Sequence, residues 1–476
     1  MPIVQAPLSL REARETIAKL AFGPTSDSTA VDSQSEPETP GAIGLEPEYF
    51  VVSREHLGTP FGRPRMFGEG ALPGAPMAII DQLDRAAADR EFGFIERSEG
   101  STLSYDLKNG GRLTFEPGSQ VEHSTKVHLT AAAAMDDVEL VRAGLERIFE
   151  REGQVLVTLG VDPWHDVLDV PQQLPGARYR AQSEFYEQRG TSGRTMMRHT
   201  TSLQINLDFG PSSVGAERWA LANMISPLIT ASFATSPCET TRGCVDGTGA
   251  ASVRAKAWQT LDPTRTGFPS NFYDADGSTA AEYYADLVLD ADVMMFCRAG
   301  QPGGMATGTA GLTFRNWIEN GHPLFGAVTR EDLAYHLTTV FPEVRARGFM
   351  EMRAADGLPA DLVAPFVVLV SGLIYDPVAR RSAIELLGDV RHRLPELWGR
   401  AAQLGLGDQE IAGLASWVWP LALEGAKRLP AGYFRQKDLD ASATFLDRYV
   451  LDSRSPSAEL GELLKSDPAA GLSWNR

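Results

Sequence analysis

The segment Gly44–Phe50 places two glutamates, Glu46 and Glu48, two residues apart in an otherwise apolar run. In an extended strand, side chains two residues apart point to the same face. Leu45 and Tyr49 would therefore face one way and the two carboxylates the other. Carboxylates held side by side repel each other, so a fold that keeps them together usually needs a cation between them. The segment predicts a strand with one apolar face and one face that attracts cations.

The composition is that of an acidic globular protein. The chain has 476 residues, of which 43% are hydrophobic and 22% charged, and its formal net charge is −18. This length allows a large core and two or three average domains. The acidity argues against binding to nucleic acid or to an anionic membrane. It is compatible with bound divalent cations, although a solvated surface accounts for most of it.

Three features bear on the cellular compartment. No apolar run approaches the roughly 20 residues of a membrane span. The N-terminal residues lack the basic and then apolar pattern of a signal peptide. The three cysteines, Cys238, Cys244 and Cys297, are sparse and poorly spaced for zinc. We therefore expect a reduced, cytoplasmic protein.

Periodicity and turn signals predict an α+β fold, with a mainly antiparallel sheet and helices beside it. Strands are expected near residue 43 and over 92–96, 102–107, 112–116, 155–159, 200–209 and 349–353. Helices are expected over 9–22, 76–88, 129–153, 217–234, 280–297 and most of 365–451, and residues 160–195 read as loop-rich. Asn109-Gly110-Gly111 is a strong hairpin turn. The regular strand–helix alternation of a doubly wound fold is missing.

The expected domain organisation has three parts. Residues 1–42 form a short helix and a mobile acidic linker that is rich in Ser, Thr and Pro. Residues 43–452 form a single catalytic domain, mostly helical from residue 365. Residues 453–476 form a C-terminal tail.

Four of the expected strands carry polar side chains on one face, and each has an apolar face for packing. If these strands lie in one sheet, their polar faces converge into a basin of carboxylate and amide oxygens, which suits Mg²⁺ or Mn²⁺ better than zinc. A single Glu-x-Glu pair is more often a solvated face, and spacing alone does not show that the strands meet. The candidate metal ligands are Glu46, Glu48, Glu116, Glu122, Gln204 and Glu351.

Other motifs narrow the chemistry. The glycine-rich segment from Gly300 to Gly304 lacks the ending of a phosphate-binding P-loop, and no dinucleotide fingerprint or nucleophile elbow is present. His123 and His128 lie near the acidic hairpin, where a structural role is the simpler reading. Surface salt bridging is the default role for each basic candidate, and holding a carboxylate or phosphate is the alternative. These candidates are Arg178, Arg180, Arg254, Lys256, Arg265 and Arg353.

Several stretches, taken together and in order, resemble the plant and proteobacterial type of glutamate–cysteine ligase. They are Phe-Glu-Pro-Gly-Ser-Gln-Val-Glu at 115–122, Thr-Met-Met at 195–197 with Gln-Ile-Asn-Leu-Asp-Phe at 204–209, Ser-Val-Arg at 252–254 with Arg-Thr-Gly at 265–267, and the run 336–356. The resemblance extends from about Gly44 to Tyr375. The acidic N-terminal extension and the length look more like the actinobacterial branch, whose γ-glutamylcysteine feeds ergothioneine synthesis.

The resemblance implies a fold and a reaction. The fold is related to the catalytic domain of glutamine synthetase, a curved antiparallel sheet that forms a funnel with helices outside. In the reaction, the γ-carboxylate of L-glutamate attacks the γ-phosphate of ATP, and the amine of L-cysteine then attacks the γ-glutamyl phosphate. The products are γ-glutamylcysteine, ADP and phosphate.

The resemblance also implies roles for single residues. The six oxygen ligands would hold two or three Mg²⁺ ions against the phosphates of ATP, the co-substrate, with Glu351 and Arg353 as catalytic residues. Arg353 would stabilise charge on the transferring phosphoryl group. Arg254, beside Trp258, looks like the residue that holds the glutamate carboxylate, with Arg178 as a second candidate. The residues expected to line the amino-acid pocket are Met196, Met197 and Thr200.

Two departures from the family pattern leave rival functions open. Arg198-His199 and Thr235 stand where relatives carry other residues, so the shape of the pocket and the acceptor amine are open to change. One rival is a carboxylate–amine ligase that uses glutamate with a different acceptor. The other is a non-catalytic protein that binds glutamate or nucleotide as a regulator.

Overall fold

The computed structural model describes residues 7–23, 40–68, 74–89, 95–98, 103–237, 249–269, 279–297 and 304–474. The predicted linker at 24–39, both Cys238 and Cys244, and the start of the glycine-rich segment lie outside these ranges.

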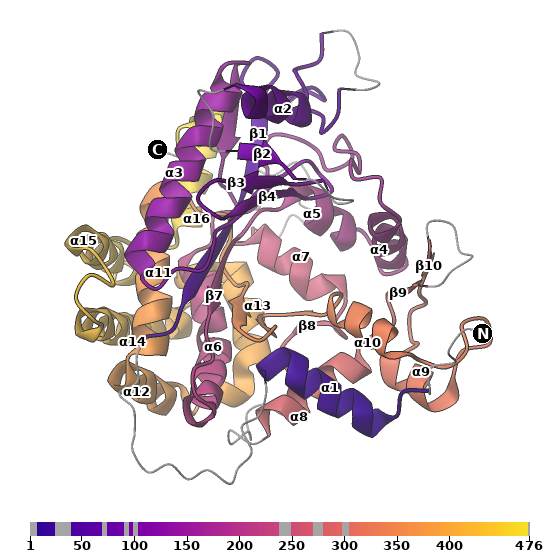
Figure 1. The fold of residues 1–476 in the computed structure, drawn as a ribbon. Helices are drawn as coiled ribbons and strands as arrows, with labels where there is room; N and C mark the ends of the chain where they lie inside the picture. The colour runs from indigo at the N-terminus through magenta and orange to yellow at the C-terminus, as the bar shows by residue number, and fades with distance from the viewer. Residues whose placement is uncertain are drawn as a thin grey trace.

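Across the described residues, nine antiparallel strands form one sheet through the centre of the molecule (Figure 1). Their order is β12 (Val344–Ala346), β13 (Met350–Met352), β7 (Leu203–Leu207), β1 (Ile43–Ser53), β5 (Val121–Ser124), β4 (Arg112–Phe115), β3 (Tyr105–Leu107) and β2 (Ile95–Arg97), and β6 (Gln154–Val157) also pairs with β1. The α+β class and the mainly antiparallel sheet predicted from the sequence are confirmed.

The long strand β1 is the element on which this sheet is built. Over its first half it pairs with β7, and then it pairs with β5 on the other side and with β6 beyond. Burial alternates along this half: Leu45, Pro47 and Tyr49 are buried, whereas Glu46 and Glu48 are half-buried. The expected separation of an apolar face from a carboxylate face is therefore present.

Helices cover the two faces of the sheet in different ways. On the apolar side of β1 lie α3 (Ala131–Glu150), α11 (Ala360–Tyr375) and α15 (Gln436–Phe445), and Leu45 shares a core cluster with Ala131, Ala134 and Val138. On the other side lie α4 (Ala177–Glu187), α5 (Ser192–His199) and α7 (Val253–Leu261) (Figure 1). The polar face of the sheet thus faces a second set of helices.

The remaining helices complete the main core and the outer layer. They are α1 (Leu10–Phe22), α2 (Ile79–Ala88), α6 (Ser212–Ser232), α8 (Ala280–Asp290), α9 (Phe314–Asn320), α10 (Arg330–Leu337), α12 (Pro377–Leu387), α13 (Leu394–Leu404), α14 (Gln409–Arg428) and α16 (Pro456–Ser466). Two short sheets pair β9 (Met295–Cys297) with β10 (Met305–Thr307), and β8 (Thr266–Gly267) with β11 (Phe341–Pro342). Among the described residues, no single helix is long and apolar enough to cross a bilayer, and only α11 with α12 passes, as a pair bent by 93°.

Three stretches differ from the sequence prediction. Residues 160–195, expected as loop, contain α4 and the first half of α5. In α4, Ala181 and Phe185 stand one helical turn apart and bury one face. The helix expected over 280–297 ends at Asp290, and its last residues form strand β9 instead. The expected tail contains α16, whose Leu460 and Leu464 pack in a cluster with β6. The division of the chain at residues 42 and 452 stays a prediction.

Candidate active site

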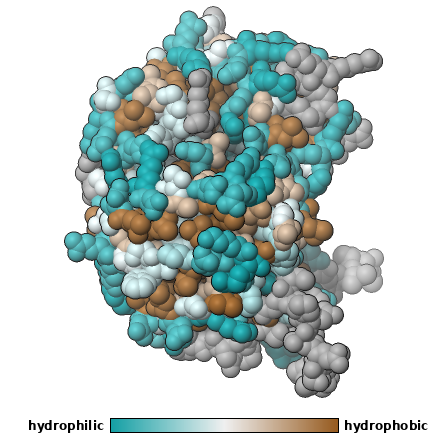
Figure 2. All heavy atoms as spheres, turned by 90° about the vertical axis from the view of Figure 1, so that its left-hand side faces the viewer, coloured by the Kyte–Doolittle hydropathy of each residue, from teal (hydrophilic) through white to brown (hydrophobic). Residues whose placement is uncertain are grey.

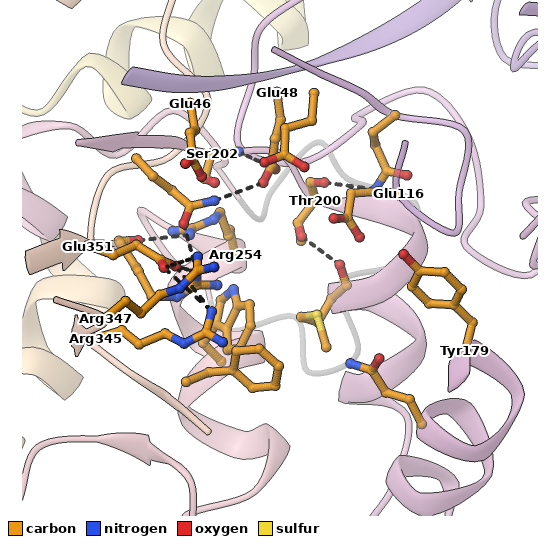
Figure 3. A pocket seen from close by; sticks show the side chains of 18 of the residues that line it. Glu46, Glu48, Glu116, Tyr179, Thr200, Ser202, Arg254, Arg345, Arg347 and Glu351 are labelled. Carbon is orange, nitrogen blue, oxygen red and sulfur yellow. Dashed lines mark hydrogen bonds and ion pairs between the residues drawn. The ribbon is translucent and has the colours of Figure 1, made fainter. Parts of the chain in front are cut away.

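A pocket of about 210 Å³ lies between the polar face of the sheet and the helices α4, α5 and α7. All six candidate metal ligands line it, so the strands predicted to converge do meet in space. Figure 3 shows that its two sides differ in charge: Arg345 and Arg347 approach Glu351 on one side, and Glu116 and Tyr179 lie at the other.

Strand register explains how residues far apart in the sequence reach one pocket. Glu48 of β1 stands opposite Glu122 of β5, and Glu46 stands opposite Gln204 of β7. One strand further, Asn206 of β7 stands opposite Glu351 of β13. Directly opposed residues on antiparallel strands lie about 4.5–5.5 Å apart, so their side chains share one face and one space.

Three of the carboxylates receive hydrogen bonds from neutral donors. The Asn206 amide donates to Glu46 (2.8 Å), the Ser202 backbone N–H to Glu48 (2.8 Å) and the Thr114 hydroxyl to Glu122 (2.9 Å). Within the described part of the chain, none of these three or Glu116 forms an ion pair within 4 Å. The carboxylate side of the pocket therefore carries negative charge that the protein leaves largely uncompensated.

The pKa values of these carboxyl groups reflect that excess. Burial, followed by the charges of Glu122 and Glu351, raises the pKa of Glu46 to about 7. Burial and the charge of Glu48 raise the pKa of Glu122 to about 7. The pKa of Glu116 is raised well above its ordinary value by burial and by Glu122 and Glu48, and burial also raises the pKa of Glu48. A cation in the pocket would reverse this effect.

These residues fit magnesium in one particular way. In the described ranges, no three Asp, Glu, His or Cys side chains come close enough to enclose a single ion. Mg²⁺ seldom uses such a cage, because it keeps several waters and binds through one or two carboxylates together with substrate phosphates. Glu46, Glu48, Glu116 and Glu122 can each supply a carboxylate to an ion of that kind.

Glu351 differs from the other candidates because three arginines already compensate its charge. Its carboxylate accepts a hydrogen bond from Arg353 (2.5 Å) and from Arg347 (3.0 Å), and Arg345 lies 3.5 Å away. Against the effect of burial, Arg345, Arg353 and Arg347 lower the pKa of Glu351 to about 2. In this arrangement Glu351 orients guanidinium groups, and ligation of a metal by Glu351 would require it to release one of them.

Arg353 links the two sides of the pocket. Besides its bond to Glu351, its guanidinium donates to Gln204 Oε1 (2.7 Å), and the Gln204 amide donates in turn to Glu48 (3.3 Å). The Arg353 guanidinium lies over the rings of Trp258 and Phe341, 5.0 and 5.6 Å from their centroids. Hydrogen bonds and stacking thus fix the plane of this cation, as recognition of a planar or tetrahedral anion requires.

Arg254 also lines the pocket and is held by Asp356. Ser252 caps α7 by accepting from Ala255 N–H, and its hydroxyl donates to Asp356 (2.8 Å). The Asp356 carboxylate also accepts from Ser236 (2.6 Å) and lies 3.8 Å from the Arg254 guanidinium. The buried Asp356 therefore ties the start of α7 to the end of the sheet and fixes the direction of Arg254.

The turn after β4 brings Glu116 and Gln120 to the pocket. Gly118 packs so closely on α5 that an added Cβ would lie 2.1 Å from the Arg198 carbonyl oxygen. Ser119 has φ = 71°, a left-handed conformation that costs a non-glycine residue energy and persists where the surroundings impose it. Buried Arg63 supplies part of that support by donating to the Gly118 carbonyl (2.6 Å).

The predicted pocket residues separate into two groups. Arg178, Met196, Thr200 and Trp258 line the pocket, as expected. Met197 does not, because it lies in a helix, where neighbouring residues point about 100° apart, and it is buried in the cluster around α4 instead.

The departures from the family pattern lie behind the wall of the pocket. His199 is fully buried, and Arg198 donates to Ser183 (3.3 Å). Thr235 is buried too, and its backbone N–H donates to Asp356 (2.9 Å). None of these three residues lines the pocket, so they affect its shape only through their neighbours.

Two arginines of the pocket, Arg345 and Arg347, were not among the predicted site residues. A signal was present, because they alternate with Val344 and Ala346, which places both on the face shared with Glu351. Tyr179 and Gln182 of α4 were missed because their segment was read as loop. Fold and site together define a pocket that opposes carboxylates to arginines, the two kinds of charge that a phosphoryl-transferring enzyme brings together.

Comparison with known proteins identifies the family. Residues 75–416 match the sequence model of glutamate–cysteine ligase family 2 (GCS2). The chain is 36% identical to the glutamate–cysteine ligase EgtA of Mycolicibacterium smegmatis over 361 residues, which cover 75% of this chain and 78% of the relative. It is 29% identical to the chloroplastic glutamate–cysteine ligase of Medicago truncatula over 333 residues, 68% of this chain and 62% of the relative. The chain belongs to the glutamate–cysteine ligase family 2.

A solved structure supports the fold independently. The glutamate–cysteine ligase of Francisella tularensis, determined in complex with AMP, superposes with a TM-score of 0.50 over 93% of this chain and 89% of that one, at 13% sequence identity. At this identity the likeness concerns the arrangement of the elements. It agrees with the α+β architecture and the large antiparallel sheet described above.

Proposed function

We propose that this chain joins the γ-carboxylate of L-glutamate to the amine of L-cysteine at the expense of ATP, with γ-glutamyl phosphate as the intermediate. Because the chain belongs to this family, its activity is that of a glutamate–cysteine ligase. The observation that carries the assignment to this pocket is the opposition of four uncompensated carboxylates to a group of four arginines, Arg254, Arg345, Arg347 and Arg353. By analogy with the family, the sheet corresponds to the funnel of the glutamine synthetase catalytic fold.

The arginines would bind the substrate carboxylate and the transferred phosphoryl group. Phosphoryl transfer depends mainly on positioning and on stabilising charge that develops on the transferred group. Arg353 is held by Glu351 and Gln204 and is oriented before substrate arrives, so it stabilises this charge without reorganising. Arg254, fixed by Asp356, is placed to bind the α-carboxylate of glutamate, with Arg178 of α4 as a second carboxylate contact.

The carboxylates would bind the metal ions. Glu46, Glu48, Glu116 and Glu122 would hold two or three Mg²⁺ ions, with Gln204 and Glu351 as further oxygen donors. When bound, Mg²⁺ supplies positive charge that neutralises the phosphates of ATP. The carboxylates themselves orient that charge, and Thr200 and Met196 close the side of the pocket that faces α5.

The reaction balances in two steps. In the first step, a γ-carboxylate oxygen of glutamate forms a bond to the γ-phosphorus of ATP, and the bond to the bridging oxygen breaks, which releases ADP. In the second step, the nitrogen of cysteine forms a bond to the acyl carbon, and phosphate leaves as the amine loses a proton. The departing phosphate can take up this proton, so the step balances without a titrating side chain.

The pathway and the location are further parts of this proposal. The relatives named EgtA support a role in ergothioneine synthesis, and the likeness to plant enzymes keeps glutathione synthesis as the alternative. A cytoplasmic location rests on the composition and cysteine content of the sequence.

The test is an acceptor panel. Purified protein is mixed with ATP, Mg²⁺, glutamate and one amine at a time, and ADP and peptide products are followed by a coupled assay and mass spectrometry. We expect ADP and γ-glutamylcysteine in equal amounts with cysteine. If cysteine yields no more ADP than glycine or no amine does, the acceptor assignment fails. If another amine is preferred, the chain is a related ligase with a different acceptor.

A further inference from the structure

Two of the three arginines around Glu351 are held by other contacts as well. Arg353 donates to Glu351 Oε1 (2.5 Å) and also to Gln204 (2.7 Å). Arg345 lies 3.5 Å from both Glu351 oxygens, and its guanidinium also donates to the Thr338 carbonyl (3.3 Å). The side chains of Arg353 and Arg345 are only 12% and 11% exposed. Both arginines are therefore fixed by contacts that do not depend on Glu351.

The third arginine, Arg347, is held much less firmly. It lies in the turn between β12 and β13, and its side chain is 49% exposed. Its guanidinium donates to Glu351 Oε2 (3.0 Å), which is its only side-chain hydrogen bond within the described part of the chain. The guanidinium also lies 5.7 Å from the centre of the Phe349 ring. Arg347 is therefore the arginine that can leave Glu351 at the loss of a single hydrogen bond.

Departure of Arg347 would uncover one particular oxygen of Glu351. Oε1 would keep its short bond from Arg353, whereas Oε2 would lose the closest of its donors. Glu46 of β1 and Glu351 of β13 flank β7 from its two sides, and Figure 3 shows Glu46, Glu351 and Arg347 on the same side of the pocket. The uncovered oxygen would thus add a ligand to the carboxylate that Glu46 already presents to a cation.

Nucleotide would offer Arg347 a new partner in the same pocket. A guanidinium binds phosphate through parallel hydrogen bonds, much as it binds a carboxylate. Arg347 lines the pocket and is half exposed, so it can meet a phosphate while the buried part of the site stays in place. Glu351 is buried and needs a positive charge beside it, but a bound cation would replace the charge that Arg347 takes away.

We propose that Arg347 exchanges partners when nucleotide binds: it leaves Glu351 Oε2 for the phosphates of ATP, and Oε2 becomes a ligand of the divalent cation. This inference rests on the proposed function, because it assigns a further residue to the binding of ATP and metal in that pocket. Arg345 and Arg353 stay on Glu351 and hold it in place. The exchange keeps Glu351 compensated in both states, and it makes the binding of metal and nucleotide depend on each other.

The experiment measures metal binding without nucleotide and nucleotide binding with metal, both on the full chain. Electron paramagnetic resonance follows the binding of Mn²⁺ alone, and calorimetry follows the binding of the ATP analogue AMPPNP in the presence of Mg²⁺. Arg347→Gln removes the residue that exchanges partners. Arg345→Gln removes an equal charge from the same carboxylate but leaves Arg347 on Oε2.

Arg381→Gln is the control for the loss of one positive charge. Arg381 belongs to α12, and its side chain is 66% exposed. This helix lies on the left-hand side of Figure 1, away from α4, α5 and α7 of the pocket. Figure 2 faces that side and shows a surface on which hydrophilic and apolar side chains alternate. Arg381→Gln should match wild type in both titrations.

We expect opposite changes in the two titrations of Arg347→Gln. It should bind Mn²⁺ alone at least about 5-fold more tightly than wild type, because Oε2 is already uncovered. It should bind AMPPNP about 10- to 100-fold more weakly, because one charged hydrogen bond to phosphate is lost. Arg345→Gln should gain no more than about 2-fold in affinity for Mn²⁺. In a Glu351→Gln background, Arg347→Gln should no longer strengthen Mn²⁺ binding, because the gain passes through Glu351.

A purely structural role of Arg347 would weaken both kinds of binding. An affinity for Mn²⁺ that does not rise in Arg347→Gln therefore overturns the exchange, as does an unchanged affinity for AMPPNP or an equal gain in the Glu351→Gln background. The titrations need no turnover, so their failure is distinct from failure of the proposed function, which the acceptor panel reports. If Arg347→Gln does not fold, a crystal structure of wild type with AMPPNP and Mn²⁺ decides, and Arg347 still bonded to Glu351 there overturns the proposal.

Discussion

Binding of Mg²⁺ at the carboxylate side of the pocket should release protons near neutral pH. Metal ligation requires the ionised carboxylates, whereas Glu46 and Glu122 each have a pKa of about 7 in the free protein. At pH 7 each group is therefore about half protonated. Their combined release is about one proton per chain, and Glu116, with its pKa raised further, adds to it.

The sign of the pH dependence follows from the direction of these shifts. Below pH 7 protons compete with the metal, so the affinity for Mg²⁺ rises with pH. It levels off above about pH 8 or 9, where Glu46 and Glu122 are ionised without metal. Proton release falls toward zero over the same interval, except for the contribution of Glu116.

The assay is isothermal titration calorimetry of Mg²⁺ into protein with an ATP analogue, in two buffers of equal pH and different ionisation enthalpy. The difference in apparent enthalpy gives the number of protons released. Glu122→Gln should lower this number by half or more, because it removes one titrating group and also one charge that raises the pKa of Glu46. Glu139→Gln, at an exposed glutamate outside the pocket, should leave it unchanged. An enthalpy that is the same in both buffers at pH 7 would refute the reasoning.

Three further predictions concern single side chains. Arg353→Met should lower kcat by about 10²–10³ with little effect on the KM for glutamate, since its contacts suit the transition state; a change in KM alone would contradict this role. Arg254→Met should instead raise the KM for glutamate by about 10- to 100-fold, as loss of a charged hydrogen bond predicts, and an unchanged KM would assign the carboxylate to another cation. Asp162→Asn should lower the free energy of unfolding by about 3–5 kcal/mol at pH 7, because it leaves buried Arg63 without its partner at 3.0 Å. Burial raises the pKa of Asp162, but His165 and Arg63 outweigh burial and lower this pKa. The stabilisation is therefore present above about pH 4 and is lost as the pH falls below about 3.9. If urea unfolding shows that Asp162→Asn costs less than about 1 kcal/mol, Asp162 does not stabilise the fold in this way.

The sequence was sufficient for features that depend on local pattern. The alternation around Glu46 and Glu48 specified which face of β1 is polar, because a strand separates neighbouring side chains whatever surrounds it. The turn Asn109-Gly110-Gly111 specified the hairpin of β3 and β4 for a similar reason, since Gly110 adopts φ = 96°.

Features that depend on tertiary pairing could not be obtained from the pattern. Nothing in the spacing indicates that Glu48 stands opposite Glu122, because the pairing depends on how distant strands come together. The same holds for Glu351, which was predicted as a metal ligand from its place on a polar face. Arg353 follows it two residues later on the same face, but Arg345 and Arg347 reach Glu351 only because β12 pairs with β13. Local pattern thus identified the polar groups, and the register decided which of them stay uncompensated.

The most direct test of the central claim is a crystal structure with a non-hydrolysable ATP analogue and Mn²⁺, in which anomalous scattering locates the metal. We expect Mn²⁺ peaks within about 2.2 Å of carboxylate oxygens from at least two of Glu46, Glu48, Glu116 and Glu122. The terminal phosphate should lie between these ions and the Arg353 guanidinium. Nucleotide and metal bound elsewhere, with these four carboxylates still free of metal, would show that this pocket is not the site of phosphoryl transfer.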